Sequence, residues 1–144
     1  MHIKALGHVI LKVRDRARTE AFYNGILGLP IAARMDDHDM TFFSLVNHHD
    51  FAVRAIGEDA PAPERNGVGL AHVAFSIGTD MEDLLQAKMH LEAAGVRIRP
   101  IDHDVTKSLY FSDADDNGIE VYVDVSDAWK DDPQLIAQIK PLDL

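Results

Sequence analysis

Apolar and polar residues alternate in two short stretches of this chain, residues 7–13 (GHVILKV) and residues 71–77 (AHVAFSI). Alternation with a period of two residues predicts a strand that buries one face. The two stretches share a small residue, a His-Val pair and the same order of apolar positions, which indicates an internal repeat. We therefore interpret each stretch as the first strand of one structural unit.

A helical pattern follows each of these strands. Apolar residues recur at helical spacing from Asp15 to Leu27, and a second helix is predicted to begin at Thr79, with Glu82 completing a capping box. Each helix is expected to end at a glycine, Gly28 or Gly95, because glycine readily adopts the left-handed conformation of a helix stop. The second helix is expected to turn four apolar side chains inward: Met81, Leu84, Leu85 and Leu91.

Three further short strands are predicted after each helix. In chain order they cover residues 31–35, 40–46 and 50–56 in the first half, and residues 96–101, 107–112 and 119–125 in the second half. The dipeptide Asn117-Gly118 predicts a hairpin turn. This turn would place Tyr110 and Glu120 on adjacent antiparallel strands.

The order β-α-β-β-β therefore occurs twice, which predicts an α+β fold. We assign one domain over residues 1–144, composed of a first module (about 1–57), a polar, Pro-containing linker (about 58–67), a second module (about 68–126) and a tail (about 127–144) with a short helix around 133–139. Each module is too small to bury a core by itself, so we expect two curved mixed sheets to pair. Equivalent positions of the two modules would then face a common cleft.

Composition excludes several classes of partner. The formal net charge of −10 argues against binding to nucleic acid or to an anionic membrane. It also disfavours a strongly anionic substrate, unless a local basic patch overrides it. The absence of Cys excludes disulfides and thiolate chemistry. The N-terminus lacks the apolar run of a signal peptide and no stretch reaches membrane-spanning length, so we expect a cytoplasmic protein.

Three residues form a candidate metal site. His8 and His72 occupy the same repeat position, and duplication would place them on one side of the cleft. Glu120 interrupts an apolar run, and a buried carboxylate is costly unless a positive charge meets it. Two imidazoles and one carboxylate are the donor set of non-haem Fe(II) oxygen chemistry and leave other metal positions open. The alternatives are hydrogen-bonded core histidines and a salt bridge from Glu120 to an Arg or Lys.

The first module carries no counterpart of the carboxylate. Aligning residues 50–53 (DFAV) with residues 118–121 (GIEV) places Ala52 where the second module has Glu120. A fourth protein ligand is therefore absent. This absence suits a metal that binds substrate or dioxygen directly.

The duplicated unit, with His on each first strand and Glu on the last strand, resembles the vicinal oxygen chelate (glyoxalase/bleomycin resistance/extradiol dioxygenase) superfamily over nearly the whole chain. Residues 101–120 (IDHDVTKSLYFSDADDNGIE) are similar to the signature of type I extradiol dioxygenases, with His103, Tyr110 and Glu120 at matching distances. The chain departs from that signature at Ala114, where Pro is usual, and at Asp116, where Gly or Pro is usual.

This resemblance implies a single-domain extradiol dioxygenase that uses Fe(II), or alternatively Mn(II) or another divalent metal, to cleave a catecholic compound with dioxygen. In residues 47–53 (NHHDFAV) it implies that His49 acts as acid and base, with His48 as the alternative and as a substrate-binding residue. It implies that Tyr110 and His103 bind the substrate oxygens. It also implies a homodimer, with the metal site either within one chain or shared between exchanged modules.

Three other functions remain open. A fosfomycin-resistance-type transferase would need cationic groups for a phosphonate, to which Lys107 and Ser108 are candidate contributors. A glyoxalase-like lyase or isomerase generally uses a fourth ligand, and Ala52 argues against it. A metal-free small-molecule-binding protein of this fold would usually have lost the ligands, whereas this chain retains all three.

Overall fold

The chain forms two compact units, Met1–Arg65 and Asn66–Leu144. The computed structural model describes every residue from 1 to 144 except residue 65, so that part of the predicted linker lies outside the described residues. No helix in the described part of the chain is both long enough and apolar enough to cross a membrane.

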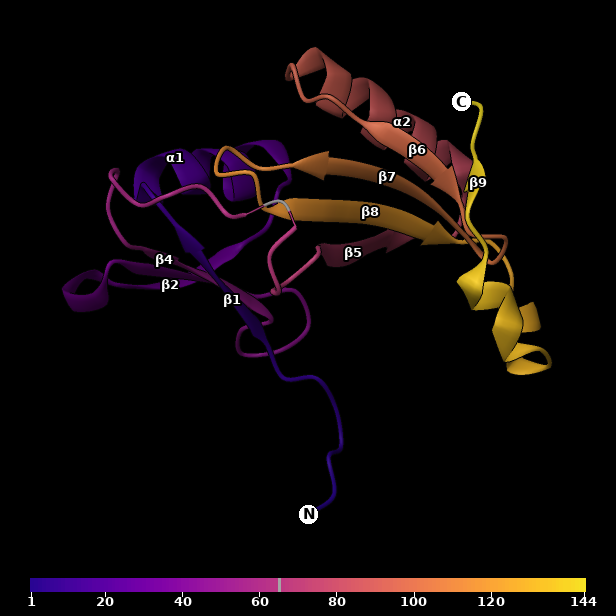
Figure 1. Cartoon of the computed structure of the whole chain (residues 1–144), viewed down its shortest axis with the longest axis horizontal. Coiled ribbons are helices and arrows are strands. Elements are labelled where there is room, and N and C mark those ends of the chain that lie inside the picture. The colour runs from indigo at the N-terminus through magenta and orange to yellow at the C-terminus, as the bar shows by residue number, and fades with distance from the viewer. Residues whose placement is uncertain (65) are drawn as a thin grey trace. The chain divides into compact units, whose positions relative to one another are not determined.

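The first unit has the predicted order of elements (Figure 1). Its strands form one mixed sheet in the order β1-β4-β3-β2, in which β1 and β4 run parallel. The helix predicted from Asp15 begins as an α-helix and continues as a π-helix. The elements are β1 (Val9–Val13), α1 (Arg16–Glu20), the π-helical segment (Ala21–Ile26), β2 (Ile31–Met35), a 3-10 turn (Asp36–His38), β3 (Met40–Phe43) and β4 (Phe51–Ala55).

Both ends of this helical segment follow from the local sequence. The Asp15 carboxylate accepts a hydrogen bond from the backbone N–H of Arg18 at 2.5 Å and so caps the first turn. Gly28 ends the segment with a positive φ of 74°. The core of this unit includes an aromatic cluster. The ring centroid of Tyr23 lies 4.8 Å from that of Phe51 and 6.0 Å from that of Phe43.

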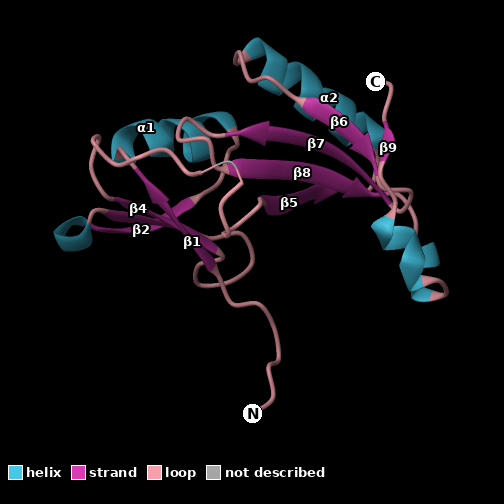
Figure 2. Cartoon of the chain, viewed as in Figure 1, coloured by secondary structure: helices cyan, strands magenta, loops and turns pink. Residues whose placement is uncertain are grey.

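The second unit repeats this order and adds a C-terminal segment (Figure 2). Its mixed sheet has the order β5-β8-β7-β6-β9, with β5 and β8 parallel. The α+β class and the mixed sheets are thereby confirmed. The elements are β5 (Val73–Gly78), α2 (Met81–Ala93), β6 (Arg99–Asp102), β7 (Thr106–Ser112), β8 (Gly118–Asp124), two 3-10 helices (Ala128–Lys130 and Pro133–Ala137) and β9 (Lys140–Pro141).

The two faces of the second sheet differ in character. Helix α2 contacts β5, β7 and β8 and contributes the buried side chains of Leu84 and Leu91. Alternation along β7 and β8 turns a set of apolar side chains to one face: Leu109, Phe111, Ile119, Val121 and Val123. The opposite face carries Tyr110 and Glu120, and we call it the site face of the second unit.

The start of α2 differs from the prediction. The helix begins at Met81 after Asp80, and no side chain caps its first turn, so the predicted capping box of Thr79 and Glu82 is wrong. The reason is that β5 extends to Gly78, which leaves Thr79 one residue ahead of the capping position. Leu85 is also exposed rather than inward, because the buried stripe passes through Leu84 and Leu91 instead.

The connection between β7 and β8 lies where the hairpin turn was predicted, although Gly118 of the Asn117-Gly118 dipeptide is the first residue of β8. Gly118 belongs to β8 and pairs with Ser112, so the turn covers residues 113–117. The carboxylate of Asp113 closes it by accepting hydrogen bonds from the backbone N–H groups of Asp115 and Asn117, each at 2.9 Å. This side chain acts together with the backbone hydrogen bonds of the turn, from Asp113 N–H to the Asn117 carbonyl and from Asp116 N–H to the Asp113 carbonyl.

The register confirms the predicted equivalence of Ala52 and Glu120. In the first unit Ile10, two residues after His8, pairs with Ala52. In the second unit Ala74, two residues after His72, pairs with Glu120. The repeat therefore extends to the pairing of individual residues.

Gly118 lets β8 approach the segment that carries His72. A Cβ added at Gly118 would overlap the carbonyl oxygen of Ala71 and lie 3.2 Å from Cβ of His72. We expect Gly118→Ala to lower the free energy of unfolding by about 1–3 kcal/mol in urea denaturation, because a rigid backbone atom cannot yield. Gly25→Ala is the matched control, since its Cβ would meet no atom within 4 Å. Equal stability of the two variants would contradict this account.

Candidate functional site

Glu120 lies in the middle of β8 and is 7% exposed. Its direct neighbours across the sheet are Tyr110 of β7 and Ala74 of β5. Paired residues point to the same face of a sheet, so all three lie on the site face. Neither neighbour carries a positive charge. The strands beside Glu120 therefore do not neutralise its carboxylate.

The group that meets this carboxylate is an imidazole. Nε2 of His72 lies 3.1 Å from Oε2 of Glu120. Among the described residues Glu120 forms no ion pair with a Lys or Arg, so the alternative of such a salt bridge is not observed. Two ligands that each bind one metal at about 2.1 Å, at a right angle, lie about 3 Å apart. The pair thus fits two adjacent positions around a divalent cation.

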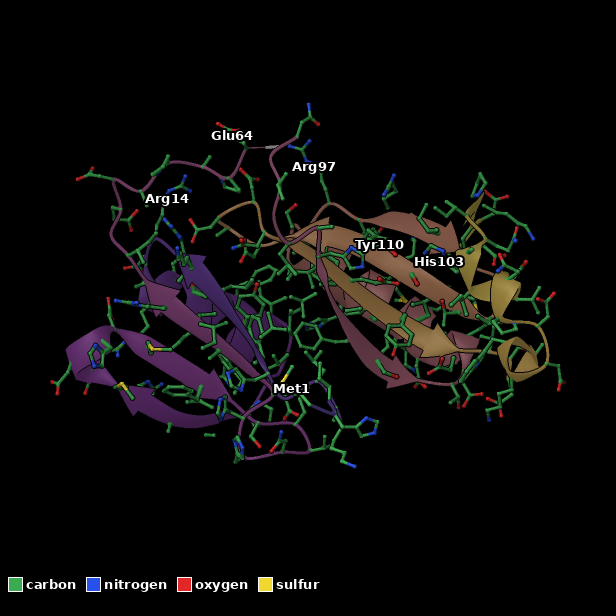
Figure 3. All side chains as sticks on the ribbon, turned by 60° about the horizontal axis from the view of Figure 1, so that its bottom comes forward. Met1, Arg14, Glu64, Arg97, His103 and Tyr110 are labelled. Carbon is green, nitrogen blue, oxygen red and sulfur yellow. The ribbon has the colours of Figure 1, made fainter. Side chains whose placement is uncertain are left out.

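The hydroxyl of Tyr110 connects Glu120 to His103. It hydrogen-bonds the carboxylate, and it lies 3.0 Å from Nε2 of His103; Figure 3 labels both residues. Burial, the hydrogen bond to Glu120 and the charge of Glu120 raise the pKa of Tyr110 to about 12, against the opposing effect of Arg99. The phenol therefore keeps its proton at physiological pH and acts as a hydrogen-bond donor.

A backbone carbonyl fixes one proton of His103. Nδ1 of His103 lies 2.6 Å from the carbonyl oxygen of Gln138, and a carbonyl only accepts hydrogen bonds. Nδ1 therefore carries a proton, and Nε2 is the ring nitrogen that faces the Tyr110 hydroxyl. Gln138 is held in place because β9 pairs with β6 and because Lys140 forms an ion pair with Asp104 at 2.6 Å.

Three histidines gather in the first unit. The ring centroid of His49 lies 4.4 Å from that of His8 and 4.5 Å from that of His48. The edge of Phe42 adds an apolar contact at 5.4 Å. Burial, followed by the charges of His8 and His48, lowers the pKa of His49, and Asp50 opposes this effect. The ring of His49 is therefore neutral at physiological pH and able to accept a proton.

The loop between β3 and β4 positions these rings. The carboxylate of Asp50 accepts hydrogen bonds from the backbone N–H groups of Leu45, Val46 and Asn47, at 2.7, 3.1 and 3.2 Å. These bonds hold the pKa of Asp50 below its usual value, with Leu45 contributing most. The charged carboxylate of Asp50 thus organises the loop that carries His48 and His49, directly before β4.

The described residues bring the predicted site residues together in two groups. His72, Glu120, Tyr110 and His103 are connected in the second unit, and His8, His48 and His49 in the first. Among the described residues, no three His, Asp or Glu side chains lie close enough to hold a metal. The triad of His8, His72 and Glu120 therefore stays a prediction.

Two contributors to the second group were not predicted from the sequence. The carbonyl of Gln138 left no signal, because a backbone oxygen is present at every residue. Arg99 did leave a signal in the sequence, because it lies four residues before His103 on an alternating segment. In the structure it pairs directly with Tyr110. Its guanidinium carbon lies 5.6 Å from the centroid of the Tyr110 ring.

Comparison with known proteins places most of this chain in one family. The model of the Glyoxalase/Bleomycin resistance protein/Dioxygenase superfamily matches residues 5–121. Catechol-2,3-dioxygenase of Bacillus subtilis (strain 168) is 32% identical over 123 residues, which cover 83% of this chain and 41% of that protein. Biphenyl-2,3-diol 1,2-dioxygenase 3 of Rhodococcus globerulus is 30% identical over 122 residues, which cover 83% and 63%. The chain thus spans less than two thirds of the length of either relative.

Solved structures show the same fold. A glyoxylase/bleomycin resistance protein/dioxygenase domain from Frankia sp. EAN1pec superposes with a TM-score of 0.72 at 24% identity, covering 89% of this chain and 97% of that one. The fosfomycin resistance protein FosX from Listeria monocytogenes superposes with a TM-score of 0.66 at 24% identity, covering 86% and 94%. Structural likeness alone therefore does not separate one activity from another.

The titration of Tyr110 tests the hydrogen-bonded group directly. In the metal-free protein we expect this phenol to ionise near pH 12 instead of pH 10. The measurement is the pH dependence of phenolate absorbance, taken as the difference between the parent and Tyr110→Phe. Because the unfolded chain would ionise first, Tyr110 makes the fold less stable as pH rises from about 10 to about 12.

Glu120→Gln provides the matched variant for this titration. Removing the carboxylate charge should lower the pKa of Tyr110, yet leave it above 10, because burial is the largest cause of the shift. Ionisation of Tyr110 near pH 10 in the parent would show that neither burial nor Glu120 acts on the phenol.

Proposed function

Because the chain belongs to the Glyoxalase/Bleomycin resistance protein/Dioxygenase superfamily, we propose that it is an extradiol-type dioxygenase that uses Fe(II) to cleave the ring of a catecholic compound. The two curated relatives described above are a catechol dioxygenase and a biphenyl-diol dioxygenase by name. Their shared substrate class, an aromatic diol, is the class that we propose for this chain, with dioxygen as co-substrate.

One observation carries this proposal. The buried carboxylate of Glu120 lies 3.1 Å from the imidazole of His72 and accepts a hydrogen bond from a protonated phenol, and no Lys or Arg pairs with it among the described residues. A buried charge of this kind is stabilised by a cation, and its donors are those that bind divalent first-row metals. His72 and Glu120 would hold the metal, and His8 would supply the third ligand.

The metal would provide the chemistry that side chains lack: Fe(II) bound there would accept both catechol oxygens and dioxygen at its open positions. Ala52 is compatible with this role, since the first unit places no carboxylate at the position equivalent to Glu120. Mn(II) or another divalent ion is the alternative occupant of the same donor set.

The remaining residues would bind and position the substrate. Tyr110 and His103 would hydrogen-bond the substrate oxygens, and the contact of His103 Nδ1 with a backbone carbonyl would hold that ring in place. His49, with its lowered pKa, would accept a proton from the catechol, and His48 beside it would contact the substrate. A homodimer remains part of this proposal.

A fosfomycin-resistance-type transferase is the first competing function. The structural likeness to FosX supports it at the level of the fold. Against it, Lys107 pairs with Asp102 at 2.5 Å, so its ammonium group is already neutralised. Ser108 is buried. The two residues considered for phosphonate binding are therefore poorly suited to that task.

Two other functions are less well supported. A glyoxalase-like lyase or isomerase would use a further ligand, and Ala52 occupies the position where the repeat would supply it. A metal-free binding protein would have no need for the close approach of His72 to a buried Glu120. Measuring the metal content of the protein distinguishes the metal-free binding protein from the metal-dependent enzymes.

Oxygen consumption tests the proposal. Protein loaded anaerobically with Fe(II) and then exposed to air and a panel of catechols is expected to consume dioxygen and form a coloured ring-fission product. Glu120→Ala should reduce bound iron and oxygen uptake by more than about 100-fold, since even residues that only support metal ligands typically contribute 10–100-fold. Metal content and oxygen uptake are measured on the same samples.

Asp124→Ala is the matched control, because Asp124 is an exposed carboxylate on the same strand. It should retain both iron and activity. Bound iron without oxygen uptake from any catechol would favour a transferase or isomerase on the same ligands. Failure of the parent protein to bind any divalent metal would favour the binding-protein alternative.

His49→Ala tests the acid–base role. This variant should bind iron and catechol as the parent does, but turn over about 10²–10⁴-fold more slowly, the usual range for loss of a general base. His90→Ala, which removes an imidazole from α2, is the control. Turnover of His49→Ala within a few-fold of the parent, together with slow turnover of His48→Ala, would move the role to His48.

A further inference from the structure

Two cations lie side by side on the first sheet. Lys12 of β1 and Arg54 of β4 are direct partners in the parallel register, and both are exposed. Neither side chain forms a hydrogen bond or an ion pair with any residue that the structure describes. Like charges placed directly opposite one another destabilise a sheet. This pair therefore destabilises the fold, and no acidic side chain among the described residues offsets the repulsion.

The two cations share a face with the candidate site residues. Alternation along β1 places His8, Ile10 and Lys12 on one side of the sheet, and pairing of Ile10 with Ala52 extends this face to β4. Phe42, which pairs with Ala52 and contacts His49, lies on it as well. The face therefore presents imidazoles at one end, apolar side chains in the middle and cations at the other end.

The strands of this sheet contain no acidic residue that could pair with these two cations. The whole chain has 24 acidic residues against 14 Lys and Arg. None of the acidic residues lies in the four strands of the first unit, whose sequences are VILKV, IAARM, MTFF and FAVRA. The third cation of these strands, Arg34, is paired with Glu20 at 2.8 Å. Lys12 and Arg54 have no such partner among the described residues.

The repeat itself does not account for these cations. The corresponding pair in the second unit, counted from His72 as Lys12 is counted from His8, is Ser76 and Tyr122. Both residues are uncharged at neutral pH. The positive charge is therefore a feature of the first unit alone, as the carboxylate of Glu120 is a feature of the second.

We propose that Lys12 and Arg54 bind a carboxylate carried by the substrate, so that the substrate class is a catechol with an acidic substituent remote from its two hydroxyl groups; this inference rests on the proposed function. Lys12 lies four residues after His8, or about 13 Å away between Cα atoms in an extended strand, and the long Lys and Arg side chains shorten that span. A single aromatic ring with a short acidic arm is of the size to reach from the imidazoles to the cations. Arg is suited to bidentate binding of a carboxylate.

A matched pair of substrates tests this inference. Protocatechuate carries a carboxylate and its amide is a neutral analogue of nearly the same shape. On iron-loaded parent protein we expect a higher kcat/KM for the acid than for the amide. In the double variant Lys12→Gln/Arg54→Gln, kcat/KM for the acid should fall about tenfold or more through KM, and kcat/KM for the amide should change less than about twofold. Added salt should weaken the preference of the parent for the acid.

Arg97→Gln is the control, because Arg97 is an exposed arginine between α2 and β6 of the second unit (Figure 3). It removes one positive charge outside the first sheet and should leave the ratio of acid to amide unchanged. An equal ratio in the parent and in the double variant would overturn the inference, while oxygen uptake with both substrates would leave the proposed function intact.

Binding measured by calorimetry distinguishes failure of the proposed function from failure of the carboxylate-binding inference. If no catechol supports oxygen uptake, the proposed function fails. Binding of protocatechuate to the same iron-loaded protein then decides the inference. Tighter binding of the acid than of the amide, lost in the double variant and kept in Arg97→Gln, would support the cation pair as a carboxylate site. Equal binding of acid and amide by the parent would overturn it.

Discussion

The burial of one carboxylate is the constraint on which the rest of the site depends. Glu120 is 7% exposed in the middle of an apolar strand, and its cross-strand neighbours, Tyr110 and Ala74, are neutral. Such a charge is expensive in a protein interior unless a positive group or a hydrogen-bond donor meets it. The close approach of His72, which Gly118 makes possible, and the retained proton of Tyr110 both follow from that requirement. A divalent cation would satisfy it completely.

The duplicated architecture makes this constraint informative. Two copies of one unit place equivalent residues at equivalent points of register, so any difference between them stands out against a common background. Ala52 replaces the carboxylate in the first copy, whereas Lys12 and Arg54 replace the neutral Ser76 and Tyr122 of the second. The copies share a histidine before the first strand and differ in charge around it. The asymmetry, rather than the repeat, carries the chemistry that we propose.

Sequence patterns predicted the elements and the pairing of Tyr110 with Glu120, because period-two alternation and helix stops are local properties. They failed where a side chain or a distant backbone group decides the outcome. The carboxylate of Asp113 helps to close the turn after β7, which the Asn117-Gly118 dipeptide alone does not indicate. The contact of His103 with the carbonyl of Gln138 joins residues far apart in the chain. The metal triad of His8, His72 and Glu120 stays a prediction, because its residues come from separate units of the chain.

Net charge and local charge lead to opposite expectations about the substrate, and the distance between charges decides which one applies. A net charge of −10 repels anions, but at physiological ionic strength dissolved salt largely screens this repulsion between charges more than about 8 Å apart. Lys12 and Arg54 act inside that range, on a sheet whose strands contain no acidic residue. A substrate with a single carboxylate therefore experiences two nearby cations more strongly than many distant carboxylates. An acidic protein can in this way bind an acidic aromatic compound without binding polyanions.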